Sequence, residues 1–177
     1  MTIPGIPDTV LQTIRLRPLR EGDAIRLHEV LADGAVLHAF EQVVAPTLEG
    51  IQEDLPNMIA GKTTHDGQMH HLSAAIADAE TDELIGLIGL DIIADGADMR
   101  IALHEEARGH GRAREALTGL LGWARDQTQL SEVCGATRAD NAASVAMMKS
   151  CGMLEEAHDP GDPHRTFIWR RDRPSPP

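Results

Sequence analysis

The chain has 177 residues, a length typical of one compact domain that buries well over half of its unfolded surface. Hydrophobic residues make up 42% and charged residues 25%, a composition that excludes collagen-like, coiled-coil and fully disordered chains. With 28 acidic against 16 basic residues the net charge is −12, which argues against nucleic acid and membrane lipid as partners and favours a neutral or cationic one.

The first twelve residues contain two prolines and a glycine, and they predict a loose leader that lacks the basic segment and apolar core of a signal peptide. No apolar run approaches the ~20 residues of a membrane span. We therefore expect a cytoplasmic protein whose two cysteines stay reduced. Residues 172–177 include three prolines and predict a disordered tail.

The folded region opens with a strand and two helices. Apolar and basic side chains alternate in residues 13–19, which is typical of a strand with one solvent-exposed face. Asp23 is suited to cap the helix that follows. A second helical pattern begins after Thr47, where Pro56 predicts a kink or two short pieces. This part of the chain therefore predicts the order strand, helix, helix.

Three strands are predicted next, over residues 70–77, 84–93 and 99–103. The middle run is apolar on both faces, so we expect a central strand that is covered on both sides. Short polar turns separate the three runs, and strands joined in this way form a meander.

The rest of the chain alternates between helix and strand. Its predicted elements are a helix from Gly111 to about Asp126, a strand over 133–137, a helix over 142–150 that Gly152 stops, and a final strand over 166–169. The whole order predicts an α/β fold, with a mixed sheet that has helices on both faces. We expect a single domain over residues 13–171.

The segment most informative about function joins the strand that ends at Leu103 to the next helix. Glycines at 109 and 111 let the backbone turn tightly and approach a ligand, and the amides at the helix start can receive phosphate oxygens. The segment also concentrates positive charge, at Arg108, Arg112 and Arg114. It predicts a phosphate-binding loop, with a solvated strand-to-helix turn as the alternative.

Two short motifs lie at the starts of the last two helices. Arg108, Gly111 and Ala113 fill the pattern Arg/Gln-x-x-Gly-x-Gly/Ala. The second motif consists of Asn141, Ser144, Lys149 and Gly152, with Met153 in place of an aromatic residue. Together with the first strand, these motifs resemble the GNAT superfamily of acetyl-CoA-dependent N-acetyltransferases, especially its ribosomal-protein α-amino acetyltransferase branch, over about residues 13–170.

The resemblance implies a mostly antiparallel sheet in which the strands ending near Leu103 and beginning near Val133 splay apart to admit the pantetheine arm of acetyl-CoA. It also implies that the amide at about Leu103 hydrogen-bonds the thioester carbonyl, and that Asn141 closes the channel. The loop residues implied to bind the cofactor are Arg108, Gly109, His110, Gly111, Arg112 and Ala113.

The catalytic groups are less evident. Many relatives use a tyrosine to protonate the departing thiolate, but this chain has no tyrosine and places Met148 at the matching position. Ser144 is the remaining hydroxyl near the expected sulfur; it would donate the proton or orient water, or it is simply a small helix residue. For the base, Asp98 matches a position where relatives often carry Glu and would pass a proton through water. Asp91 is a rival, and both have the alternative of a plain surface carboxylate.

The histidines do not predict a metal site. His70 and His71 are adjacent on a predicted strand, so their side chains point to opposite faces and cannot readily share zinc. His104 and His110 border the phosphate loop, where a protonated imidazole would help to bind an anion; a surface position is the alternative. We expect no metal.

The leading functional hypothesis is direct transfer of acetyl from acetyl-CoA to a primary amine. An α-amino group has a reference pKa near 8 and a lysine amine one near 10, so the lack of an obvious strong base favours a protein or peptide N-terminus as acceptor. The acidic surface suits a basic protein, but it equally suits an aminoglycoside or a polyamine, which form the second hypothesis. A catalytically silent acyl-CoA sensor is the third. We expect a monomer or homodimer.

Overall fold

The computed structural model describes residues 4–63, 69–159 and 161–171. The helices are α1 (Ala24–Leu31), α2 (Gly34–Ala39), α3 (Leu48–Ala60), α4 (Arg112–Gln127) and α5 (Ala142–Ser150), with short 3-10 turns η1 (Glu21–Asp23) and η2 (Glu105–Ala107). The strands are β1 (Thr9–Val10), β2 (Ile14–Arg17), β3 (Lys62–Thr63), β4 (Met69–Asp78), β5 (Leu84–Ile93), β6 (Gly96–Leu103), β7 (Glu132–Arg138), β8 (Leu154–Glu155) and β9 (His164–Arg170).

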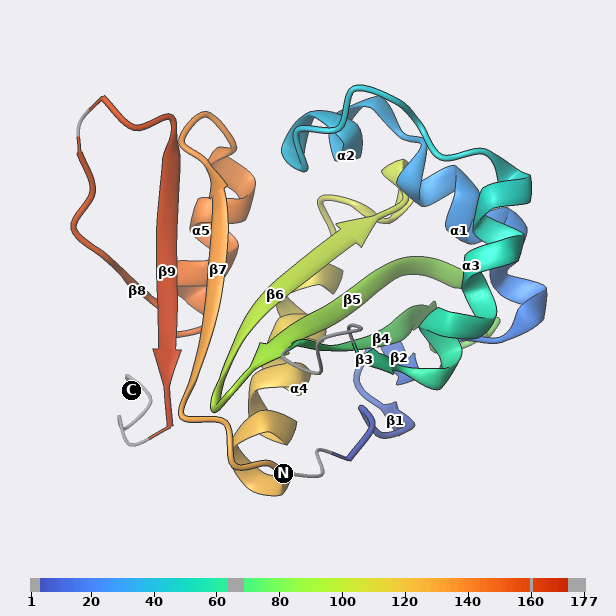
Figure 1. Cartoon of the computed structure of the whole chain (residues 1–177), viewed down its shortest axis with the longest axis horizontal. Helices are drawn as coiled ribbons and strands as arrows, with labels where there is room; N and C mark the ends of the chain where they lie inside the picture. The colour runs from blue at the N-terminus through green and yellow to red at the C-terminus, as the bar shows by residue number, and fades with distance from the viewer. Residues whose placement is uncertain (1–3, 64–68, 160, 172–177) are drawn as a thin grey trace.

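The strands described here form one nine-stranded sheet (Figure 1). Its order is β1-β2-β4-β5-β6-β7-β9-β8, and β3 pairs with β4 outside this path. Neighbouring strands are antiparallel, except that β6 and β7 are parallel, because the crossover helix α4 joins them. This arrangement confirms the predicted mixed, mostly antiparallel sheet.

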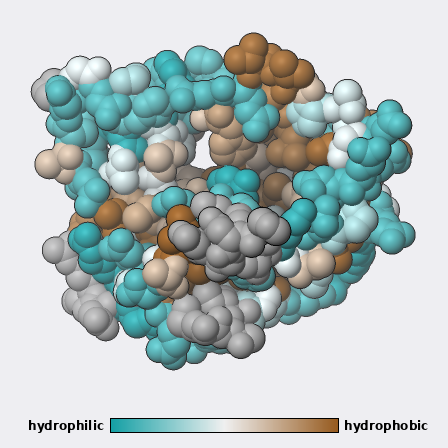
Figure 2. Space-filling model, viewed as in Figure 1, coloured by the Kyte–Doolittle hydropathy of each residue, from teal (hydrophilic) through white to brown (hydrophobic). Residues whose placement is uncertain are grey.

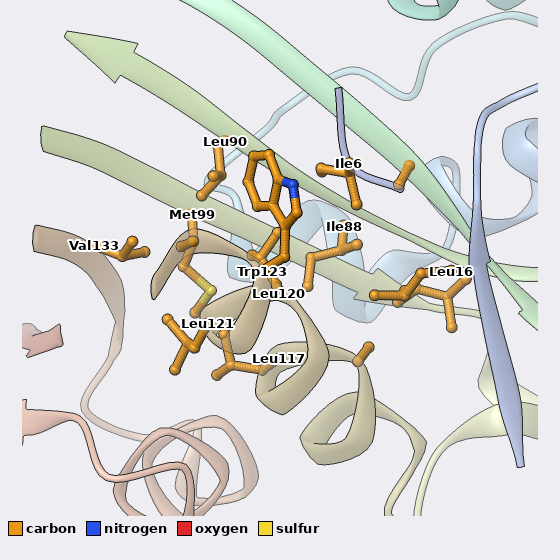
Figure 3. Close-up of a cluster of buried hydrophobic side chains, with 14 of the residues drawn as sticks. Ile6, Leu16, Ile88, Leu90, Met99, Leu117, Leu120, Leu121, Trp123 and Val133 are labelled. Carbon is orange, nitrogen blue, oxygen red and sulfur yellow. The ribbon is translucent and has the colours of Figure 1, made fainter. Parts of the chain in front are cut away.

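Helices cover both faces of the sheet. The larger core joins α4 and α5 to one face, and its centre is the apolar stripe of α4 with Trp123, which packs near Ile88 and Ile6 (Figure 3). A smaller core on the other face joins α1 and α3 to β4 and β5. Strand β5 contributes to both, with Ile88 in the larger core and Leu84 in the smaller one. The prediction of a central strand covered on both sides is confirmed.

The parallel pair β6–β7 separates soon after it begins. Its register runs only from Gly96 opposite Glu132 to Asp98 opposite Cys134, and beyond that point the two strands are not paired with each other. Gly135 lies at the point of separation, where an added Cβ would come within 2.8 Å of side-chain atoms of both Met99 and Met148. Figure 1 shows β6 and β7 diverging from this point. The predicted splay is therefore present.

Two polar residues are buried where β2 meets η1. Arg17 donates to both carboxylate oxygens of Asp23 at 2.8 and 2.9 Å, and the two side chains are 2% and 8% exposed. Arg17 also donates to Asp82 in the β4–β5 turn at 3.1 Å. The hydrogen bond to Asp23 is the main reason that the pKa of Arg17 is raised. This cluster ties β2 to η1 and to the distant turn between β4 and β5.

Two expectations need correction, and one helix was not predicted. The leader is not loose over residues 6–11, because Ile6 is buried and β1 pairs with β2. Pro56 does not divide its helix, since α3 is continuous from Leu48 to Ala60. Helix α2 was not expected from the sequence. Residues 172–177, expected to be a disordered tail, lie outside the described residues.

Both cysteines are free thiols. Within the described part of the chain, no helix is long and apolar enough to cross a membrane.

Candidate acetyl-CoA site

The loop between β6 and α4 has the geometry of an anion-binding turn. Gly109 and Gly111 have φ values of +80° and +76°, a left-handed conformation that glycine adopts most readily. A Cβ added at either position would meet no atom within 4 Å, so the space beside both glycines is open. Gly111 caps α4, a helix of 16 residues, whose first amides therefore adjoin this space. The residues present fit a pyrophosphate group.

Arg108, the first residue of the loop motif, links three elements. Its Nε and Nη2 atoms donate to the carbonyl oxygen of Leu103 at 3.0 and 2.8 Å, and Nη2 donates to Asp33 Oδ1 at 2.6 Å. Asp33 in turn caps α2 by accepting from the amides of Ala35 and Val36. Burial would raise the pKa of Asp33, but the hydrogen bonds from Arg108 and from these amides lower it. The carboxylate is thus charged and holds Arg108 in place.

The other two arginines of the segment differ in their contacts. Arg112 donates to Asp78 at 3.0 Å, and this ion pair partly neutralises its charge. Arg114 is exposed and forms no ion pair with any residue that the structure describes. Its guanidinium is therefore the more available positive charge beside the loop.

A cavity of about 560 Å³ opens at the loop and extends between β6, α5 and α2. Its lining residues are Ala35, Val36, Ala39, Phe40, Ile101, Ala102, Leu103, Ala107, Arg108, Gly109, Gly111, Arg112, Ala113, Arg114, Asn141, Ala143, Ser144, Ala146, Met147 and Ser150. The sequence predicts ten residues for the site, namely eight cofactor-binding residues and the catalytic candidates Ser144 and Asp98. Eight of these ten line this one cavity. His110 and Asp98 do not line it.

The edge of β6 that faces the gap carries backbone amides that, among the residues that the structure describes, have no partner in β7. The amide of His104 donates to the carbonyl of Ile85 in β5 at 2.8 Å. Because successive amides of a strand point to opposite sides, those of Leu103 and Ile101 face β7, beyond the last β6–β7 pair. Leu103 adjoins the phosphate loop, whereas Ile101 lies deeper in the gap. The motif does not single out Ile101, because only the strand register shows which amides face the gap.

Helix α5 forms the opposite wall. Asn141 is its N-cap and accepts from the amide of Ser144 at 3.2 Å, so it fixes the corner between β7 and α5. Ser144 is half-buried and lines the cavity. Met148, which stands where many relatives have tyrosine, is 0% exposed and packs in the larger core. A buried thioether cannot act as a proton donor, and the hydroxyls of this wall that line the cavity are those of Ser144 and Ser150.

The two candidate carboxylates lie on the sheet outside the cavity. Asp98 is exposed and belongs to the last β6–β7 pair, three residues and therefore roughly 10 Å along the strand from Ile101. Asp91, opposite Asp98 on β5, hydrogen-bonds His71 at 2.5 Å and Arg100 at 2.7 Å. At these positions, either carboxylate would reach the cavity only through water.

The two histidines beside the loop are also outside the cavity. His110 is exposed. His104 is half-buried between Glu29 and Glu106, whose carboxylates lie 3.9 and 3.8 Å from its ring nitrogens. Neither imidazole lines the cavity.

Comparison with known proteins places this chain in a family. Residues 13–154 match the model of the acetyltransferase (GNAT) domain. Similar solved structures include a GNAT-family acetyltransferase from Bacillus anthracis, with 16% identity, a TM-score of 0.78 and coverage of 94% of this chain and 100% of that one. No curated protein sequence matches significantly.

Two further structures of the same fold are complexes with CoA. One is spermidine N-acetyltransferase from Vibrio cholerae with CoA and spermine, with 20% identity, a TM-score of 0.74 and coverage of 90% and 96% of the two chains. The other is the ribosomal L7/L12 α-N-acetyltransferase RimL with CoA, with 20% identity, a TM-score of 0.73 and coverage of 94% and 98%.

The chain belongs to the GNAT acetyltransferase family, because the family model spans most of its length. It is accordingly an acyl-CoA-dependent N-acetyltransferase, as the two motifs predicted.

Proposed function

We propose that this enzyme transfers acetyl from acetyl-CoA to the N-terminal α-amino group of a peptide or protein. The lining of the cavity carries the proposal: it includes three arginines but, among the described residues, no carboxylate and no imidazole. A polyamine brings further ammonium groups, for which the described lining offers no carboxylate partner. An α-amino group, with a reference pKa of about 8 against about 10 for lysine, needs the least help to lose its proton.

The chain's own groups account for binding of the cosubstrate. The backbone of residues 109–113 and the first amides of α4 would hold the pyrophosphate, with Arg114 adding positive charge. The unpaired amides of β6 would hydrogen-bond the pantetheine arm, and Asn141 would stand at the opposite wall. Acetyl-CoA supplies the activated acetyl thioester when it is bound.

The donor for the thioester carbonyl is the amide of Ile101 rather than that of Leu103. Leu103 lies beside the loop, where its carbonyl contacts Arg108, and the pantetheine arm separates the pyrophosphate from the thioester. The thioester therefore reaches deeper into the gap. A fixed amide that faces the developing negative charge contributes about 3 to 4 kcal/mol to an acyl transfer.

The transfer forms one bond and breaks another, and it requires two proton transfers, one from the amine and one to the thiolate. The neutral amine attacks the carbonyl carbon, the new C–N bond replaces the C–S bond, and the amine nitrogen loses a proton to water. We propose that Asp98 accepts this proton at the sheet surface and that Ser144 gives its hydroxyl proton to the departing thiolate while taking a proton from water in its place. His110 is exposed beside the loop and has no part in either step.

An acceptor comparison tests the proposed function. A short peptide with a free alanine or serine N-terminus should be acetylated faster at pH 7.5 than the same peptide blocked at its terminus and offering only lysine. Release of free CoA measures both rates. Equal rates, or faster release with spermidine, would instead favour a small cationic amine. Absence of release with every amine would support a silent acyl-CoA sensor.

The role of Ser144 has its own test. If its hydroxyl protonates the thiolate, Ser144→Ala should lower kcat by about 10²-fold and leave the affinity for acetyl-CoA nearly unchanged. Alanine favours helices, so α5 should be preserved. A kcat within about threefold of the parent value would show that Ser144 only packs against the cavity and that water protonates the thiolate.

A further inference from the structure

Helix α2 crosses the open end of the gap, above the tip of β6 and between the two sides of the splayed sheet (Figure 1). The surface shows an opening between these sides in the same view (Figure 2). The helix supplies one wall of the cavity, through Ala35, Val36, Ala39 and Phe40. It therefore borders the cavity that is proposed to take CoA.

Packing alone explains little of the position of α2. The helix has six residues, and Val36 is the buried one among them. A helix this short is not stable by itself in water, so its place depends on contacts at its ends.

Each end of α2 is fixed to a different side of the gap. At the N-terminal end, Asp33 binds Arg108, which also holds the end of β6 through the carbonyl of Leu103. Just beyond the C-terminal end, Glu41 lies 3.0 Å from Nε2 of His164 in β9 and 3.6 Å from Arg138 at the end of β7. Glu41 has a φ of +54°, a conformation that costs energy in a residue with a side chain.

The contacts of Asp33 and Glu41 therefore connect β6 with β7 and β9 at the end where β6 and β7 are not paired with each other. Past Asp98 and Cys134 no β6–β7 pairing joins the two sides in the described residues. A segment that is fixed to β6 at one end and to β7 and β9 at the other spans this unpaired stretch.

We propose that Asp33 and Glu41 are positioning residues that hold α2 as one strap across the splayed strands, and that the strap sets the width of the cavity that takes CoA. The inference rests on the proposed function, because it assumes that this cavity binds CoA. Neither residue lines the cavity, so each acts through the strap and, for Asp33, through Arg108.

Calorimetric titration of the full chain with CoA tests the strap in four variants: Asp33→Asn, Glu41→Gln, the double variant, and Asp126→Asn as control. Asp33→Asn retains a capping oxygen for α2, so the helix itself is kept. The control removes a similar carboxylate that pairs with Arg125 on the surface, away from the gap.

Each single variant should weaken CoA binding by about fivefold, and the double variant by no more than about twice the larger single effect, because one released end already frees the strap. The control should bind like the parent. Thermal melting should show all four variants folded.

Three results would overturn the strap. Removing a carboxylate near a phosphate site should by charge alone tighten CoA binding, so unchanged or tighter binding in Asp33→Asn contradicts positioning. Unchanged binding in Glu41→Gln does so as well. A double effect equal to the product of the single effects would show two independent contacts. Failure of the parent protein to bind CoA would instead count against the proposed function.

Discussion

Replacing Gly111 with valine is expected to weaken CoA binding more than tenfold, which corresponds to about 1.4 kcal/mol. Two effects act together. The φ of +76° at this position is unfavourable for any residue with a Cβ, by about 1 to 2 kcal/mol, and more so for a β-branched one. In addition, the added side chain would fill the open space beside the loop, where a pyrophosphate would bind the first amides of α4.

Gly122→Val is the matched control for this prediction. Gly122 lies in the same helix, and a Cβ there also meets no atom within 4 Å, but its φ is not in the left-handed range. Calorimetry with CoA should therefore give near-parent affinity for Gly122→Val and a large loss for Gly111→Val, with both variants folded. Equal affinities would remove the loop from the cofactor site.

The largest effect on stability is expected from Asp23→Ala, which should lower the free energy of unfolding by about 3 kcal/mol, the lower end of what breaking a buried ion pair costs. The substitution leaves Arg17 buried without its main partner, although Asp82 still accepts from it at 3.1 Å. The amide of Arg20 also loses the acceptor that it finds in Asp23 at 2.8 Å. Urea unfolding, analysed at constant m value, measures the change.

A second variant separates the ion pair from packing. Removing both charges, in Arg17→Met/Asp23→Leu, should destabilise less than Asp23→Ala alone, because no unpaired charge is then left buried. Asp126→Ala, which breaks an exposed pair, should change stability by less than about 1 kcal/mol. A loss below about 1 kcal/mol for Asp23→Ala would mean that water or Asp82 fully replaces the lost partner.

Much of the fold and of the cofactor loop could be predicted because their signals are local. The stripe of α4 repeats over four turns, and the glycines at 109 and 111 both have the positive φ that their place before a helix suggested. Gly152, predicted to stop α5, also has a positive φ, of +80°. Strand β5 was predictable because burial on both faces leaves a continuous apolar run.

The parts that escaped prediction depend on contacts between distant residues. Helix α2 has six residues, too few for a periodic pattern, and its cap Asp33 finds Arg108 75 positions away. Which amide of β6 faces the gap follows from the register with β5, so the motif indicated the strand but not Ile101. The placement of Asp98 and Ser144 agrees with their expected elements, and their catalytic roles stay predictions.

The separation of β6 from β7 also bears on how this protein avoids aggregation. Strands that carry unpaired amides and carbonyls readily recruit a strand of another chain, a hazard usually confined to the outer edges of a sheet. Here two such edges lie inside the sheet, facing each other, with α4 and α5 packed against one side and α2 across the open end. A second polypeptide strand would have to displace α2 to reach these edges, whereas a narrow, extended ligand that carries a few amides would fit beneath it. The fold thus leaves these two strand edges open to a small, extended ligand but protects them from pairing with a strand of another protein chain.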